Sequence, residues 1–181
     1  MSGGTAADPA VVEIRRVSPD DALAEPLLRG LTEEYLGRYG ERAHEEMARY
    51  PSSEFHPPHG LLLLLLEDGV PVAGGAYRRY DGRTAEVKRM WTAVGHRRRG
   101  LARRVLAELE AAAAAAGHGR MYLTTGPLQP EAKGLYLATG YTPLFDVTAD
   151  PSTVGPLAFE KRLAAPPAGR PDVRAAQVLK P

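Results

Sequence analysis

A basic turn between a strand pattern and a long helix pattern is the feature that most restricts how this chain can fold. Residues 84–94 have the composition of a strand, and residues 100–116 are almost wholly strong helix formers that stop at Gly117. Five cations lie within eight residues at the start of that helix, namely Arg97, Arg98, Arg99, Arg103 and Arg104. Cations are unfavourable near a helix N-terminus, where the dipole and the unpaired backbone N–H groups favour anions. The sequence therefore predicts a turn that holds an anion such as a pyrophosphate, with Gly100 and Ala102 leaving its main chain accessible.

The composition excludes several classes of site and partner. The 181 residues include no cysteine, which rules out disulfides, thiolate metal sites and a cysteine nucleophile. The net charge of +1 gives no general attraction for nucleic acid or anionic lipid. Any partner attracted by charge must therefore be bound by a local cluster such as the basic turn. Two other interpretations of this turn stay open, a solvated arginine cluster and a local nucleic-acid-binding patch.

The chain divides into one domain and two short ends. We expect residues 1–10 to be a disordered N-terminus, 11–163 a folded domain, and 164–181 a mobile tail rich in Pro, Ala and Arg. The longest apolar run, Leu61–Leu66, is far shorter than the roughly 20 residues that span a bilayer as a helix. Without a secretory signal pattern at the start, the sequence predicts a cytoplasmic protein with no membrane partner.

Periodicity and capping residues predict alternating strands and helices. Strands are expected over residues 11–16, 61–66, 70–80, 84–94, 121–125, 141–147 and 157–163. A helix is expected to begin at Ser18-Pro19, to be interrupted by Pro26, and to resume from about Leu28 to Tyr50. Further helices are expected over residues 100–116 and 129–140. This order predicts a mixed α/β single domain.

The pattern Arg97-x-x-Gly100-x-Ala102, after a strand and at the start of a helix, resembles the acetyl-CoA loop of the GNAT superfamily of N-acetyltransferases. The resemblance covers about residues 11–163. It implies an α/β fold with a mixed central sheet of about seven strands and four flanking helices, in which the fourth and fifth strands are splayed to hold acetyl-CoA. It also implies an enzyme that uses acetyl-CoA as co-substrate and needs no metal.

A second segment, residues 85–91, resembles the fourth strand of small bacterial members of this superfamily. Glu86 lies 11 positions before Arg97, the offset at which several members carry a general base. The strand also carries Lys88 and Arg89, although a central strand covered by helices should be apolar. Unpaired buried charges are costly, so these groups must face a cleft or one another. The alternative to a catalytic Glu86 is a structural ion pair with Lys88 or Arg89.

A third segment, residues 124–141, resembles the superfamily's Asn-x-x-Ala-x-x-x-Tyr segment followed by Gly-Phe/Tyr. Gln129, Ala132, Tyr136, Gly140 and Tyr141 stand at the matching places. The resemblance implies that Tyr136 lies near the sulfur of coenzyme A and acts as general acid. The alternative is a tyrosine whose ring belongs to the core.

Residue by residue, the resemblance implies that the coenzyme is held by Trp91, Thr92, Arg97, Arg98, Arg99, Gly100, Leu101, Ala102, Arg103 and Gln129. It implies direct transfer to a small-molecule amine, with Glu86 taking a proton from the amine and Tyr136 giving one to the thiolate. Thr92, Val94 and Gln129 depart from the residues usual at their positions.

Candidate acceptor-binding residues are Tyr35, Phe55, His56, Arg78 and Arg89. Arginines beside the expected cleft favour an amine that also carries a carboxylate, such as an amino acid. A metal role for His56 and His59 is not favoured, because no carboxylate partner is evident. Two alternatives to the enzyme are an acyl-CoA-binding sensor without activity and the nucleic-acid-binding module. Many relatives of this fold are dimers, and a homodimer is open here.

Overall fold

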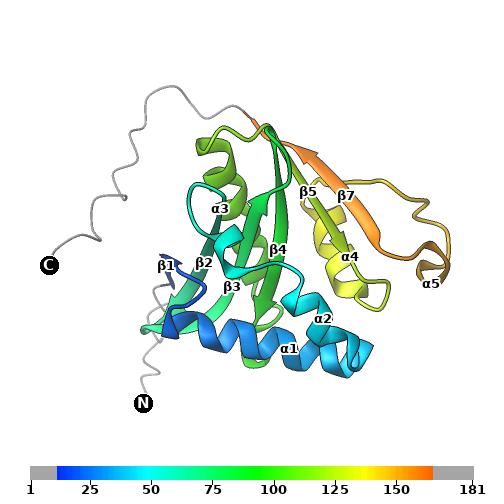
Figure 1. Ribbon diagram of the computed structural model, residues 1–181. Helices are drawn as coiled ribbons and strands as arrows, with labels where there is room; N and C mark the ends of the chain where they lie inside the picture. The colour runs from blue at the N-terminus through cyan, green and yellow to red at the C-terminus, as the bar shows by residue number, and fades with distance from the viewer. Residues whose placement is uncertain (1–11, 165–181) are drawn as a thin grey trace, which may run out of the picture.

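The protein is described here by a computed structural model over residues 12–164. The predictions of a disordered segment 1–10 and a mobile tail from 164 onward lie outside these residues, apart from residue 164 itself. Seven strands form one sheet in the order β1-β2-β3-β4-β5-β7-β6 (Figure 1). Their bounds are β1 Val12–Val17, β2 Gly60–Glu67, β3 Val70–Arg79, β4 Thr84–Thr92, β5 Arg120–Thr125, β6 Thr142–Pro143 and β7 Leu157–Arg162.

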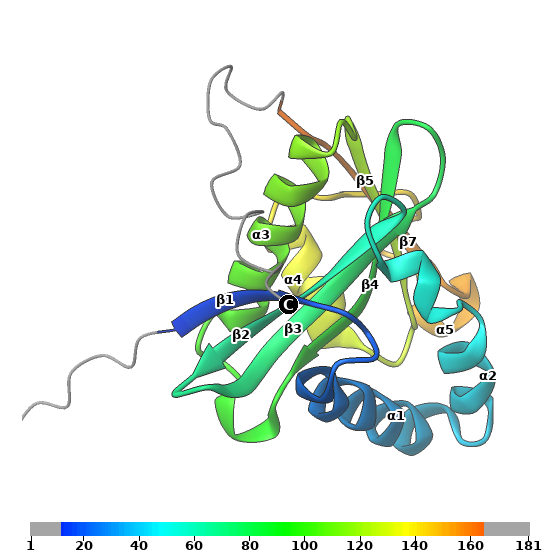
Figure 2. The same ribbon diagram turned by 60° about the vertical axis from the view of Figure 1, so that its left-hand side comes forward.

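Helices cover both faces of the sheet (Figure 2). The α-helices are α1 Glu25–Tyr39, α2 Arg42–Ala48, α3 Leu101–Ala115, α4 Pro130–Ala138 and α5 Pro151–Val154, with short 3-10 helices at Ala22–Ala24, Ser52–Phe55 and Val94–His96. The mixed α/β fold with a seven-stranded sheet confirms the predicted fold class. No helix in residues 12–164 is long and apolar enough to cross a membrane.

The leucine run of β2 lies in the middle of the core and divides it in two. Leu61, Leu63 and Leu65 pack with α3 and α4 on one face, and the alternate leucines of the run pack with α1 on the other. Side chains of a strand alternate between faces, so a strand covered on both sides reads as an uninterrupted apolar run. This explains why a six-leucine sequence is a strand and not a helix fragment.

The parallel pair β4–β5 opens beside the basic turn. Its register covers only Thr84↔Arg120, Ala85↔Met121 and Glu86↔Tyr122. Beyond Glu86, β4 continues to pair with β3 while β5 pairs with β7. The two strands therefore diverge toward their C-terminal ends, as Figure 1 shows, and the splayed pair predicted from the family resemblance is confirmed.

The first helical region differs from the prediction in two places. Pro26 does not interrupt a helix but stands in the first turn of α1, where its missing N–H costs no hydrogen bond. The break falls instead at Gly40, whose φ of 63° ends α1 before α2 begins. Ser18 is not the cap of a long helix: its hydroxyl accepts from Asp20 N, and Asp21 caps the short 3-10 helix that follows.

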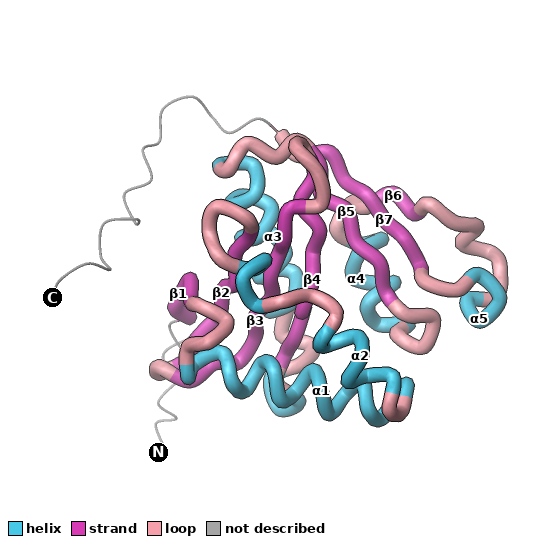
Figure 3. Tube along the Cα trace, viewed as in Figure 1, coloured by secondary structure: helices cyan, strands magenta, loops and turns pink. Residues whose placement is uncertain are grey.

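The last predicted strands are only partly present. Residues 141–147 were expected to be one strand, but β6 spans only Thr142–Pro143 before an irregular segment and α5 (Figure 3). Asp146 and Asp150 each accept hydrogen bonds from the residues two positions on. Such local side-chain bonds compete with a strand ladder, which shortens β6.

Candidate active site

The basic turn is a loop that leaves its backbone open at the start of α3. Gly100 adopts a left-handed φ of 75°, and no side chain caps the helix. A Cβ built at Gly100 or at Gly95 meets nothing within 4 Å. The first N–H groups of this 15-residue helix therefore have no side-chain cap, and no side chain crowds Gly100. This geometry is the one predicted for an anion site, and the residues that would hold the anion remain a prediction.

The arginines of this loop divide into two groups. Arg97 pairs with Glu34 of α1 at 3.4 Å, and Arg99 pairs with Glu67 of β2 at 2.5 Å. The hydrogen bond from Arg99 lowers the pKa of Glu67. Within residues 12–164, Arg98, Arg103 and Arg104 form no ion pair, and Arg104 Nη2 donates to the Val12 carbonyl at 3.3 Å. The first group fixes the loop to the sheet and α1, whereas Arg98 and Arg103 have no such partner among these residues.

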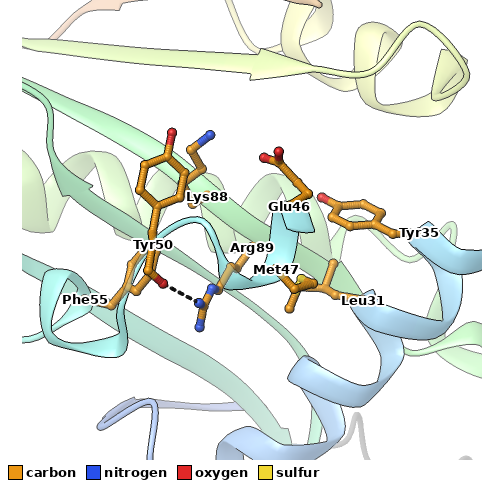
Figure 4. A pocket seen from close by; sticks show the side chains of 8 residues that line it. All are labelled: Leu31, Tyr35, Glu46, Met47, Tyr50, Phe55, Lys88 and Arg89. Atoms are coloured by element: carbon orange, nitrogen blue, oxygen red, sulfur yellow. Dashed lines mark hydrogen bonds between the residues drawn. The ribbon is translucent and has the colours of Figure 1, made fainter. Parts of the chain in front are cut away.

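On the other side of β4, a bulge directs two consecutive cations to the same face. The β3–β4 register shifts between Gly74 and Ala76, and Arg89 has a φ of 57°. Lys88 and Arg89 consequently both line a pocket between β4, α1 and α2 (Figure 4). The pocket is lined by Leu31, Tyr35, Glu46, Met47, Tyr50, Phe55, Lys88 and Arg89.

Glu86 lies next to this pocket and is only 3% exposed. Its carboxylate accepts a hydrogen bond from Arg78 Nε at 2.8 Å and pairs with Lys88 Nζ at 3.1 Å. The pair with Lys88 was one of the structural alternatives foreseen for Glu86, whereas the pair with Arg78 was not foreseen. These two cations fix the position of the carboxylate beside Lys88, which lines the pocket.

Arg78 is occupied by two carboxylates. Besides Glu86, it contacts Glu54 at 2.8 Å, and its guanidinium stacks over the Tyr50 ring at 4.3 Å. These neighbours raise the pKa of Arg78 against the effect of its burial. A guanidinium already engaged on both sides is poorly placed to bind a substrate, although the sequence made it a candidate.

Tyr136 lies on α4, and Gln129 is the residue that precedes this helix. The Tyr136 ring is 5% exposed and packs at 5.6 Å between Tyr141 and Phe159. Burial, followed by the nearby Tyr35, raises the pKa of Tyr136 above its ordinary value of 10. Gln129 precedes α4 and accepts from Thr125 Oγ1 at 2.9 Å, which joins the end of β5 to the helix.

Tyr35 of α1 contacts Gln129, the residue that precedes α4. Its pKa is raised to about 12, mainly by burial and then by Glu34 and Glu46, while a side-chain hydrogen bond with Gln129 opposes the shift. Further along α1, Arg38 pairs with Glu131 of α4. These contacts hold α1 against the β5–α4 loop.

The other candidate acceptor residues lie at different depths. Phe55 is buried and its ring lies 4.3 Å from the Arg89 guanidinium, inside the pocket lining. His56 does not line the pocket; its Nε2 lies 3.4 Å from Ser18 Oγ and 3.6 Å from Asp20 Oδ2. Among residues 12–164, no group of three His, Asp or Glu side chains is arranged to hold a metal.

The arrangement therefore combines an open helix N-terminus, a divergent strand pair and a polar pocket around a single strand, β4. A model of the acetyltransferase (GNAT) family matches residues 25–141, which contain all three. The chain belongs to the GNAT acetyltransferase family. It is therefore an acyltransferase by family, with the splayed β4–β5 pair that its fold requires.

Solved GNAT structures share the fold at low sequence identity. A Klebsiella pneumoniae protein named for acyl-CoA N-acyl transfer is 24% identical with a TM-score of 0.65, covering 84% of this chain and 98% of its own. The PaiA N-acetyltransferase of Thermoplasma acidophilum, solved with coenzyme A, is 18% identical with a TM-score of 0.64, over 84% and 99%. YncA of Salmonella typhimurium, solved with acetyl-CoA, is 16% identical with a TM-score of 0.64, over 91% and 99%. No curated protein matched the chain.

Sequence reasoning missed half of the pocket lining. Leu31, Glu46, Met47 and Lys88 are not among the residues expected to bind the acceptor, although Lys88 stands out as a charge in a central strand. That charge was the available signal. The shared face of Lys88 and Arg89 depends on the bulge, which no local pattern indicates.

Proposed function

We propose that this GNAT protein transfers an acetyl group from acetyl-CoA to a primary amine of a small molecule, by direct transfer in a ternary complex. The observation that carries the proposal is the position of β4 between the divergence from β5 and the polar pocket. A thioester beside β4 and an amine in the pocket would meet at the strand's C-terminal half. Proximity of this kind lowers the barrier by replacing a bimolecular encounter.

The coenzyme would be bound by backbone groups. The N–H groups at the start of α3 and the side chains of Arg98 and Arg103 would hold the diphosphate, with Arg97 and Arg99 shared between the coenzyme and their carboxylate partners. Ala93 N donates to Val72 O of β3. Successive strand residues point to opposite edges, so Thr92 N–H would face the open side and stabilise the oxyanion.

In this mechanism the amine nitrogen forms a bond to the thioester carbonyl carbon and the C–S bond breaks. On going from ammonium to amide the nitrogen loses two protons, one to a base and one that would restore the proton donor through solvent, and the leaving thiolate gains one. An alkylammonium has a pKa near about 10, so a base must take a proton before or during attack, and Glu86 is the proposed base. Tyr136 is proposed to give a proton to the leaving thiolate. Its raised pKa keeps the hydroxyl protonated at neutral pH, as a donor must be.

One observation favours a second candidate, an acyl-CoA-binding protein without catalysis. Glu86 is engaged by both Arg78 and Lys88, as expected of a structural carboxylate. The experiment is calorimetry with acetyl-CoA, followed by a panel of free amino acids, polyamines and aminoglycosides monitored for free thiol. Binding with thiol release supports the enzyme. Binding without release from any amine supports the second candidate, and no binding contradicts both.

A further inference from the structure

Arg89 is the exception among the half-buried arginines. In residues 12–164 this class consists of Arg38, Arg78, Arg89 and Arg120. Three of them have a carboxylate oxygen within 3.0 Å, whereas Arg89 has no ion pair among the described residues. A half-buried guanidinium without a counter-charge is costly, so its retention calls for an anion from outside the chain.

The Arg89 guanidinium is only partly satisfied by the protein. Its Nη2 donates one long hydrogen bond of 3.5 Å to the Tyr50 carbonyl, and its Cζ lies 4.3 Å from the centre of the Phe55 ring. Burial lowers its pKa, and no carboxylate acts against that effect. A guanidinium carries five N–H donors, so most of them are left for a ligand.

The cavity in front of Arg89 has the size of a small anionic group. Its volume is about 30 Å³, room for one or two water molecules or a carboxylate but not for a whole substrate. In Figure 4 the polar ends of Tyr50, Lys88 and Glu46 point to the side where β5 runs, while the Arg89 guanidinium lies deeper, next to the Tyr50 carbonyl. A group bound at Arg89 would leave the rest of the ligand facing β5.

We propose that Arg89 is the specificity-determining residue of the acceptor site and binds the carboxylate of an amine that also carries an acid group. Arg78 does not take this role, because Glu54 and Glu86 already neutralise it. Arg79 is exposed and donates to the Pro58 carbonyl at 3.2 Å, outside the pocket lining. This inference rests on the proposed function for the amine, but carboxylate recognition can be measured without turnover.

The experiment compares charged and neutral product-like ligands in the presence of coenzyme A. Calorimetry is done with N-acetylglycine, N-acetyl-L-leucine and N-acetyl-L-phenylalanine, each against its carboxamide. The proteins are wild type, Arg89→Gln, Arg89→Lys and, as a charge-matched control, Arg29→Gln on the exposed face of α1. A charge-assisted bidentate pair predicts that Arg89→Gln weakens binding of the acid about 10- to 100-fold. The amide should change less than about twofold, as should both ligands with Arg29→Gln.

Several results would overturn the inference. It fails when no acid binds better than its amide, or when Arg89→Gln weakens acid and amide equally. If Arg89→Gln does not fold, Arg89→Lys is measured in its place. Lysine keeps the charge but lacks the planar guanidinium that binds a carboxylate through two hydrogen bonds. This variant must therefore still bind the acid better than the amide, by a smaller factor than wild type. Thiol release is recorded in the same preparations. Acid binding through Arg89 without thiol release from any amine supports this inference and contradicts the proposed function; thiol release with no acid preference does the reverse.

Discussion

Trp91 of β4 lies against Gly30 of α1, and its indole ring fills the space that a side chain at position 30 would occupy. A Cβ there would overlap indole Nε1 and lie 3.0 Å from Cδ1. Gly30 therefore sets how closely α1 approaches the half of β4 where we propose that the thioester binds. The helix that forms one wall of the pocket is positioned by the absence of a single methyl group.

Gly30→Ala should lower the free energy of unfolding by about 1–3 kcal/mol, because the indole must move within a packed layer. Gly37→Ala is the matched control in the same helix, since its Cβ meets nothing within 4 Å. Helix propensity alone should make that control more stable by up to about 1 kcal/mol. Denaturant unfolding and acetyl-CoA calorimetry measure both; equal shifts in the two variants would contradict the packing argument.

The loop arginines without an ion pair should contribute to coenzyme affinity. Arg98→Gln with Arg103→Gln should weaken acetyl-CoA binding about tenfold, the sum of two exposed charge contacts. The loss should shrink as salt rises, because exposed charges are screened. Arg29→Gln with Arg42→Gln removes the same charge from α1 and α2. A similar loss in that control would show a general effect of net charge and not a site.

Glu86→Gln should reduce kcat about 100-fold or more if Glu86 removes the proton. Raising the pH toward the amine pKa of about 10 should then restore much of the rate, because the free amine no longer needs a base. A purely structural role predicts a loss that does not depend on pH. Glu54→Gln, which removes the other carboxylate on Arg78, is the control and should show no such rescue.

Tyr136→Phe keeps the ring contacts with Tyr141 and Phe159 but removes the proposed proton donor. We expect kcat to fall about 10- to 100-fold with unchanged acetyl-CoA affinity. Since burial raises the pKa of Tyr136, the wild-type rate should not decline through its ionisation below pH 10. Tyr141→Phe, from the same cluster, should leave kcat unchanged. A loss of equal size in both variants would assign Tyr136 to the core alone.

His118 should make the protein less stable in acid. Burial, followed by the charge of Arg79, lowers its pKa from 6.5, and its buried Nδ1 has no partner among the described residues. The neutral ring is thus favoured by folding, so its contribution is complete above pH 6.5 and is lost as the pH falls below that value. Thermal unfolding between pH 8 and pH 5 should show a smaller decline for His118→Asn than for wild type. His44→Asn, exposed on α2, should follow wild type.

The order of most strands and helices, and the turn with Gly100 at the start of α3, could be predicted from sequence. The six-leucine run, the helix formers after Gly100 and the stop at Gly117 act through bonds and propensities within a few residues. The prediction was wrong where local signals compete, at Pro26 and at residues 141–147. Pro26 fits the first turn of a helix as well as it breaks one, so its position relative to α1 decides which occurs.

Only the tertiary structure decided which charges are free. Arg78 and Arg89 are both basic strand residues in the sequence, yet Glu54 and Glu86 neutralise Arg78, and the bulge turns Arg89 toward an apolar ring and the pocket. Glu54 comes from a 3-10 helix 24 residues before Arg78, and the bulge from the pairing of β3 with β4. Such contacts depend on the packing of distant segments, so local sequence patterns carry no record of them.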